Sequence, residues 1–187
     1  MNTEDELLPV LTEHEIAERI SQIGAQITSD YRGKDLVVIG ILKGAFIFMA
    51  DLIRKIDLPV LVDFVRLRSY GASTESDGNV SISKDVELPL KGKHVLIVED
   101  IVDTGYTLKY LKELLSLHKI ESAKICCLID KKERRKVDID VEYVGFEIKK
   151  GFLVGYGLDY DEQYRNLAGI YHLNPGYNAK GFRPSER

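Results

Sequence analysis

Short apolar runs that alternate with segments of helical periodicity limit the folds open to this chain more than any other feature. Leu36 to Leu42 is continuously apolar, as expected of a strand buried on both faces of a sheet. Similar β-branched and aromatic runs follow, and helical spacing of apolar residues separates several of them. We expect strands at residues 36–42, 60–67, 93–98, 124–129, 141–146 and 152–156, and helices at 13–29, 45–56 and 108–118. This alternation predicts an α/β fold with a mostly parallel, twisted sheet.

The length of 187 residues favours one domain spanning residues 1–187, because no linker or internal repeat divides the chain. Two regions lack periodicity: residues 69–84, which are rich in Ser, Gly and Asp, and the polar tail from Asn174 onward. A loop as long as 69–84 inside a compact domain is usually a lid, a binding loop or a disordered segment.

The composition excludes several classes of function. A formal net charge of −4 lacks the broad positive field that binding to nucleic acid or anionic membranes needs, so we expect neither partner. The N-terminus is acidic with no apolar run after it, and no secretory signal is expected. Adjacent Cys126 and Cys127 would point to opposite faces of a strand, which favours reduced core cysteines and a cytoplasmic setting. The four histidines are scattered without ligand spacing, so none is assigned to a metal.

The stretch from Val95 to Thr107 carries the clearest chemical pattern. An apolar strand is followed by two carboxylates, Glu99 and Asp100, and then by Asp103-Thr104-Gly105-Tyr106-Thr107 leading into a helix. A turn of small and hydroxyl-bearing residues at the start of a helix offers unpaired backbone N–H groups to a phosphate. Neighbouring carboxylates would repel a bare anion unless a divalent cation or sugar hydroxyls lie between them. The pattern therefore indicates a sugar phosphate, and the two commonest rival phosphate motifs are absent from the sequence.

This stretch closely resembles the 5-phosphoribosyl-1-pyrophosphate (PRPP) binding motif of the type I phosphoribosyltransferases. Leu42-Lys43-Gly44 is similar to that family's pyrophosphate loop, Arg68-Ser69-Tyr70 to the start of its flexible lid, and residues 154–160 to its purine-and-magnesium segment. The aspartate of Asp103-Thr104-Gly105 resembles the hypoxanthine/guanine branch. The resemblance implies the family's parallel sheet with a small hood subdomain, a lid at about residues 69–84, and a homodimer or homotetramer.

The same resemblance implies the chemistry: transfer of the phosphoribosyl group from PRPP to a 6-oxopurine, with Mg²⁺ as cofactor, in purine salvage. PRPP and its 5′-phosphate would be held by Glu99, Asp100, Asp103, Thr104, Gly105, Tyr106 and Thr107. The pyrophosphate would contact Lys43, Gly44 and Arg165, and Mg²⁺ would be bound by Glu99, Asp100 and Asp159. The purine would contact Lys131, Phe152, Leu153 and Asp159, and the lid would begin with Ser69 and Tyr70.

Asp103 is the candidate catalytic residue, because the matching aspartate of the family faces N7 of the purine and can accept a proton as the bond to N9 forms. A helix N-cap is an equally natural role for an aspartate before Thr-Gly, and the two roles are compatible. Lys43 taken alone would be a solvated lysine. Lys131 lies in the charge run 130–136, whose ordinary interpretation is a solvated surface, and the family's Leu-x-x-Lys pattern assigns only this lysine to the purine.

Two other functions fit parts of the pattern. A pyrimidine-operon regulator shares the fold, binds RNA and retains uracil phosphoribosyltransferase activity, but Asp103, Lys131 and the acidic balance argue against it. A non-catalytic PRPP synthetase-like or scaffold protein would keep the motif and would not depend on Asp103.

Overall fold

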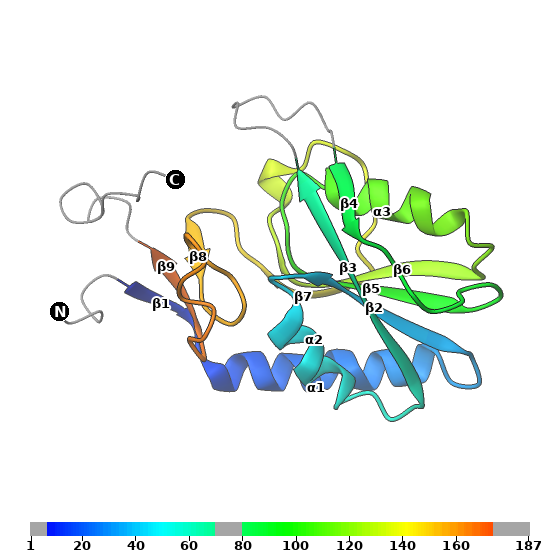
Figure 1. Cartoon of the computed structure of the whole chain (residues 1–187). Helices are drawn as coiled ribbons and strands as arrows, with labels where there is room; N and C mark the ends of the chain where they lie inside the picture. Colours follow the sequence, from blue (N-terminus) through cyan, green and yellow to red (C-terminus); the bar gives the residue numbers. More distant parts are fainter. Residues whose placement is uncertain (1–6, 70–79, 174–187) are drawn as a thin grey trace.

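A six-stranded sheet forms the larger part of the molecule, as Figure 1 shows for this computed structural model, which describes residues 7–69 and 80–173. The strand order is β4-β3-β2-β5-β6-β7, and β4 alone runs antiparallel to its neighbour. The strands are β2 (Leu36–Leu42), β3 (Val60–Ser69), β4 (Val80–Lys84), β5 (His94–Val102), β6 (Ser122–Asp130) and β7 (Tyr143–Glu147). The predicted mostly parallel α/β sheet is confirmed.

Helices cover both faces of this sheet, which explains why its central strands are apolar throughout. Helices α1 (Glu13–Asp30) and α2 (Phe46–Ile53) pack on one face, and α3 (Tyr106–Ser116) packs on the other (Figure 1). In β2, Val38 joins the cluster on the side of α1 and α2, whereas Val37 and Ile39 join the cluster on the side of α3. Successive strand residues thus serve opposite cores.

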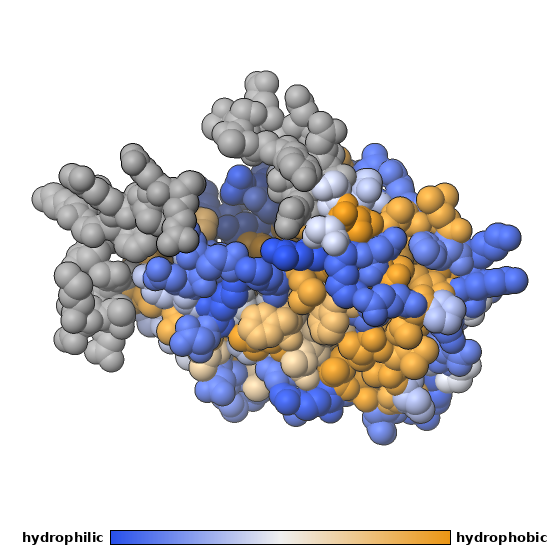
Figure 2. Space-filling model, in the orientation of Figure 1, coloured by the Kyte–Doolittle hydropathy of each residue, from blue (hydrophilic) through white to orange (hydrophobic). Residues whose placement is uncertain are grey.

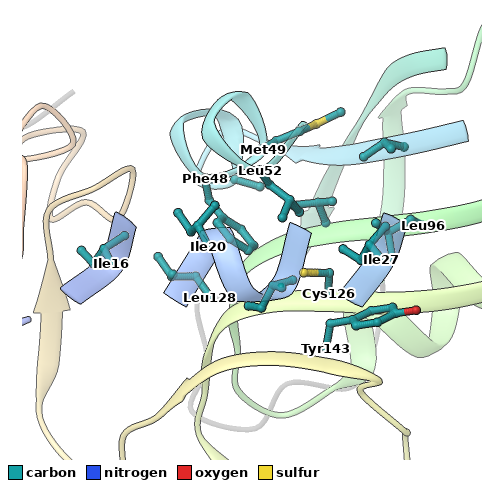
Figure 3. Close-up of a cluster of buried hydrophobic side chains, with 14 of the residues drawn as sticks. Ile16, Ile20, Ile27, Phe48, Met49, Leu52, Leu96, Cys126, Leu128 and Tyr143 are labelled. Atoms are coloured by element: carbon teal, nitrogen blue, oxygen red, sulfur yellow. The ribbon is translucent and has the colours of Figure 1, made fainter. Parts of the chain in front are cut away.

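Helix α1 follows the sequence prediction closely. Thr12 Oγ1 accepts a hydrogen bond from Glu15 N at 3.2 Å, and Glu15 Oε2 accepts one from Thr12 N at 2.8 Å, which is the predicted capping box. The isoleucines at helical spacing are buried, and Figure 3 shows Ile20 and Ile27 among side chains of α2 and of β5 and β6.

A small antiparallel sheet of order β1-β9-β8 lies beside the C-terminal edge of the main sheet (Figure 1). It is built from β1 (Leu7–Leu11), β8 (Phe152–Val154) and β9 (Ile170–Leu173). Pro9 is tolerated because β1 is an edge strand of this sheet. This sheet is the expected hood, and we use that name for it below.

The structure corrects four predicted elements. Strand β5 continues to Val102, so the acidic pair lies within the strand rather than after it. Ser69 ends β3 and residues 80–84 form β4, so both ends of the predicted lid segment 69–84 are paired strands. Strand β8 belongs to the hood and not to the parallel sheet. Helix α3 runs two residues earlier than predicted, and His118 lies beyond its end. Over the described ranges, no helix has both the length and the apolar character needed to cross a membrane.

Candidate active site

The sheet reverses its winding direction between β2 and β5, and the predicted site residues lie at that point. From β2 the chain crosses through α2 to β3 on one side, and from β5 it crosses through α3 to β6 on the other. Ligands of such sheets bind outside the carboxyl ends of the strands at this switch. A pocket of about 220 Å³ opens there, lined by Ile41, Leu67, Glu99, Asp100, Ile101, Val102, Asp103, Thr104, Gly105, Thr107 and Leu108. It gathers every residue predicted to hold PRPP and its 5′-phosphate except Tyr106.

Glu99 and Asp100 are both buried, and among the described residues neither forms an ion pair with a cationic side chain. Burial, together with repulsion from Asp100, raises the pKa of Glu99 well above its usual value. Two adjacent buried carboxylates without a cation are an unfavourable arrangement that a bound divalent cation would relieve.

The loop after β2 brings Lys43 and Gly44 to the same place. A side chain at position 44 would lie 1.7 Å from Asp100 Oδ2, so only glycine lets this loop approach the carboxylate. The other side of the loop faces Gly157, where an added Cβ would lie 2.2 Å from the Gly44 carbonyl oxygen. The Leu42–Lys43 peptide bond is cis. Gly44 therefore connects the acidic pair of β5 with the segment after β8.

The turn from Asp103 to Thr107 delivers the N-terminus of α3 to the pocket. Gly105 is the N-cap residue in a left-handed conformation, with φ of 88°, and α3 has no side-chain cap. Asp103 is therefore not the helix N-cap, which corrects the structural alternative considered for it. The Thr104 carbonyl accepts hydrogen bonds from the backbone N–H groups of Lys136 and Val137 at 3.0 and 3.3 Å. Tyr106 is half-buried as the first residue of α3.

Asp103 is held by the segment that follows β6. Arg134 Nη1 lies 3.2 Å from Asp103 Oδ2, whereas Oδ1 is buried and has no hydrogen-bond partner among the described residues. Arg135 donates from Nε to the Asp103 carbonyl at 3.3 Å and from Nη1 to the Ile139 carbonyl at 3.2 Å, and it also pairs with buried Asp130. One carboxylate oxygen of Asp103 thus pairs with Arg134, and the other is buried without a hydrogen-bond partner among the described residues.

Lys131 is buried and not solvated, unlike most of its charge run. Its Nζ donates to the Gly151 carbonyl at 2.7 Å, and its backbone N–H donates to the Val102 carbonyl at 2.9 Å. Burial lowers the pKa of Lys131, and the nearby Asp103 carboxylate acts in the opposite direction. Next to Gly151, the half-exposed Phe152 meets Tyr160 edge to face at 5.5 Å between ring centroids, while Leu153 is buried. Of the predicted purine residues, Lys131 thus lies near Asp103, and it bonds to the residue that precedes Phe152.

Lys43, Asp159 and Arg165 form a third group, beside Gly44. Arg165 Nη2 lies 2.8 Å from Asp159 Oδ1, and Arg165 Nη1 donates to the Gly157 carbonyl at 2.7 Å. Lys43 Nζ lies 2.9 Å from Glu162 Oε2. Asp159 is therefore paired with a cation and lies apart from the acidic pair, and the described residues contain no group of three metal-ligating side chains. Oxygen donors of this kind fit Mg²⁺, which binds through few carboxylates and keeps its waters.

The two predicted lid residues, Ser69 and Tyr70, come where β3 ends. Ser69 forms the last pair of β3 with Val80 of β4, and Tyr70 lies outside the described residues. Sequence reasoning missed four residues that shape the site: Arg134, Arg135, Gly151 and Glu162. The first two were hidden in a charge run, and the other two stand in loops whose contacts come only from the tertiary fold.

The comparisons with known proteins agree with this geometry. Residues 9–161 match the phosphoribosyl transferase domain family. The hypoxanthine phosphoribosyltransferase of Haemophilus influenzae is 49% identical over 86% of this chain and 92% of its own length. A hypoxanthine-guanine phosphoribosyltransferase of Staphylococcus aureus is 51% identical over 89% of this chain and 93% of its own. A crystal structure of a hypoxanthine phosphoribosyltransferase from Staphylococcus aureus superposes with a TM-score of 0.91 at 47% identity, covering 97% of this chain and 100% of that one.

A pocket lined by paired carboxylates and a glycine-containing turn, at the switch point of a parallel sheet and next to a hood, is typical of the phosphoribosyltransferases. The chain belongs to the type I phosphoribosyltransferase family, in its hypoxanthine-guanine branch.

Proposed function

We propose that this protein transfers the 5-phosphoribosyl group of PRPP to N9 of hypoxanthine and/or guanine, giving IMP or GMP and pyrophosphate in purine salvage. The observation that carries the proposal is the pocket lined by Glu99, Asp100, Asp103 and the turn to Thr107, with buried Lys131 bonded to its lining residue Val102. The relatives named above, which share about half of its sequence, support the same activity.

PRPP would lie across the carboxyl ends of β2 and β5. The backbone N–H groups and hydroxyls of Thr104, Gly105, Tyr106 and Thr107 would bind its 5′-phosphate at the start of α3, where the helix dipole favours an anion. Glu99 and Asp100 would bind the ribose hydroxyls. Lys43 and Arg165, with the N–H groups around Gly44, would bind the pyrophosphate group and stabilise the charge that it gains on leaving.

Glu99 and Asp100 would bind Mg²⁺, and Asp159 would reach a magnesium ion at the other side of the cleft. The metal would neutralise the phosphate oxygens of PRPP. The fit rests on the acidic pair of β5, which is buried without a cationic partner among the described residues. Glu99, Asp100 and Lys43 would together hold the substrate in the cleft.

The purine would lie between the hood and Asp103. Phe152 would stack on the ring, and the backbone of Leu153 and Asp159 would contact its edge. Lys131 would donate to the 6-oxo group, because its Nζ is already buried and directed by the Gly151 carbonyl. Adenine carries an amino donor at that position and would leave Lys131 unpaired, so the site would select oxopurines.

In the transfer, the bond between C1 of the ribose and the pyrophosphate oxygen breaks, and pyrophosphate leaves with the electron pair. The purine N9 forms the new bond to C1, and the purine gives up a proton from N7 to the Asp103 carboxylate. Asp103 suits this role because Oδ2 is held by Arg134 while Oδ1 is free of partners among the described residues. The chain's contribution is positioning and charge stabilisation.

Three further proposals rest on the resemblance. Residues 69–84 would include a lid that excludes water, since β3 and β4 lead directly into and out of it. The chain would form a homodimer or homotetramer; Figure 2 shows apolar residues gathered on the face in view, and exposed large side chains include Phe46, Leu61 and Val62. A cytoplasmic location fits the two free, buried cysteines.

Replacement of the proposed base tests the function. We expect Asp103→Asn to lower the kcat of IMP formation from PRPP and hypoxanthine by about 10²-fold or more, because it removes the proton acceptor while keeping the shape. The exposed Asp138→Asn is the matched control and should retain wild-type kcat. A scaffold or PRPP synthetase-like protein predicts equal rates for both variants, and that result would overturn the proposed role.

A further inference from the structure

One carboxylate oxygen holds both cations proposed for the pyrophosphate. Glu162 Oε2 lies 2.9 Å from Lys43 Nζ and 3.2 Å from Arg165 Nη2. Lys43 and then Arg165 lower the pKa of Glu162, so its side chain is charged at neutral pH. The pyrophosphate group of PRPP would have to contact the same two cations, so it would take the place of the Glu162 carboxylate.

The backbone of the loop that carries Glu162 has an uncommon conformation, which directs this side chain toward Lys43 and Arg165. Asp161, Glu162 and Tyr164 have φ values of 50°, 62° and 71°, in the left-handed region that residues other than glycine rarely adopt. The Glu162 backbone N–H donates to Asp159 Oδ2 at 2.9 Å. Such conformations persist where the surrounding structure fixes them, and they concentrate at functional sites.

Arg165 does not need Glu162 in order to stay in place. Its Nη1 donates to the Gly157 carbonyl at 2.7 Å and its Nη2 pairs with Asp159 at 2.8 Å, and its side chain is only 18% exposed. The Glu162 side chain is 62% exposed and forms no hydrogen bond or ion pair in the described residues beyond those with the two cations. Its carboxylate is therefore free to swing into solvent when another anion arrives.

We propose that Glu162 is an internal competitor of pyrophosphate: its carboxylate occupies the pyrophosphate subsite, must leave when PRPP binds, and returns to Lys43 and Arg165 as the product leaves. The inference rests on the proposed assignment of these two cations to the pyrophosphate. Its consequence is a weaker hold on pyrophosphate and faster product release, since each departing contact is replaced by one with Glu162.

Calorimetric titration of the full-length protein with inorganic pyrophosphate and Mg²⁺, at about 0.15 M ionic strength where charges separated by more than about 8 Å are screened, tests this directly. We expect Glu162→Gln to bind pyrophosphate about three- to tenfold more tightly than wild type, the range that two exposed ion pairs permit. Glu162→Asp keeps the charge but shortens the reach, and it should fall between the two.

Two control variants separate the possible explanations. Asp161→Asn removes the same charge one residue away, and asparagine tolerates the left-handed backbone, so its affinity should stay within about twofold of wild type. Lys43→Met should weaken binding about tenfold or more; unchanged binding would overturn the proposed subsite and the inference with it. If Lys43→Met binds pyrophosphate more weakly than wild type, the proposed subsite stands. The inference about Glu162 is then contradicted if Glu162→Gln binds pyrophosphate no more tightly than wild type. It is also contradicted if Asp161→Asn tightens pyrophosphate binding as much as Glu162→Gln does.

Discussion

At the scale of single residues, Lys131 shows how burial changes the meaning of a charge. Within the polar run 130–136 it alone is a buried lysine, and burial lowers its pKa. Its partner in the described residues is the neutral Gly151 carbonyl, so its donors are directed without being neutralised by a carboxylate. A buried donor of this kind discriminates between ligands mainly by the cost of leaving it unpaired.

We therefore expect Lys131→Met to lower kcat/KM for hypoxanthine by about 10²-fold or more and to reduce the preference for hypoxanthine over adenine. Steady-state kinetics with both bases provide the measurement. Lys132→Met, which changes the exposed neighbouring lysine, is the control and should leave the preference intact. An equal loss for both bases in Lys131→Met would show that the lysine does not read the 6-position.

The raised pKa of Glu99 predicts how the stability of the protein depends on pH. Because its pKa is raised in the folded chain, the folded chain binds more protons than the unfolded chain above about pH 4.5. The free energy of unfolding contributed by this group therefore falls as pH rises through that window. Without Mg²⁺, Glu99→Gln should remove this dependence and raise the free energy of unfolding at pH 7, at the expense of activity.

Denaturant unfolding in the presence of a chelator, at pH 5 and at pH 8, measures this effect. Glu121→Gln is the control, because its side chain is exposed and its stability profile should follow that of wild type. If wild type and Glu99→Gln change in parallel between the two pH values, Glu99 does not hold its proton in the folded chain.

At the scale of elements, the segment after β6 clamps the turn after β5. Arg135 bonds the Asp103 and Ile139 carbonyls and pairs with Asp130, and the Thr104 carbonyl accepts from the backbone of Lys136 and Val137. The proposed phosphate turn is thus held by contacts from a loop far along the chain. Its geometry depends on a partly buried guanidinium whose several donors lysine cannot match.

Arg135→Lys should accordingly destabilise the protein by about 2 kcal/mol or more, because a buried pair with Asp130 is left poorly satisfied. It should also weaken PRPP binding, since the turn loses its support. Thermal unfolding and the KM for PRPP are the two readouts. Lys136→Gln alters an exposed side chain of the same segment and should change neither; a stable Arg135→Lys variant with normal KM would contradict the clamp.

At the scale of the whole molecule, the parallel sheet was predictable because its central strands are buried on both faces, and the apolar runs record this. The hood was expected only from the family resemblance: β1 contains Pro9, and β9 is four residues long. Strand β4 was missed because its stability comes from pairing with β3.

The candidate site divides in the same way. Residues of the PRPP motif could be named from the sequence, because they follow one another along β5 and the turn after it. Contacts made between distant loops could not, and these include the approach of Gly44 to Asp100, the bond from Lys131 to Gly151 and the position of Glu162 between two cations. Such contacts depend on tertiary packing, which leaves no periodic trace in the sequence.

The central claim is that this site transfers phosphoribose to 6-oxopurines. The most direct test is incubation of the full-length protein with PRPP and Mg²⁺ and with hypoxanthine, guanine, xanthine, adenine or uracil in separate reactions, with nucleotide formation followed chromatographically. We predict IMP from hypoxanthine and/or GMP from guanine, with pyrophosphate in equal amount, and far slower reaction of adenine and uracil. Conversion of uracil without conversion of hypoxanthine would contradict the account and point to a pyrimidine-operon regulator.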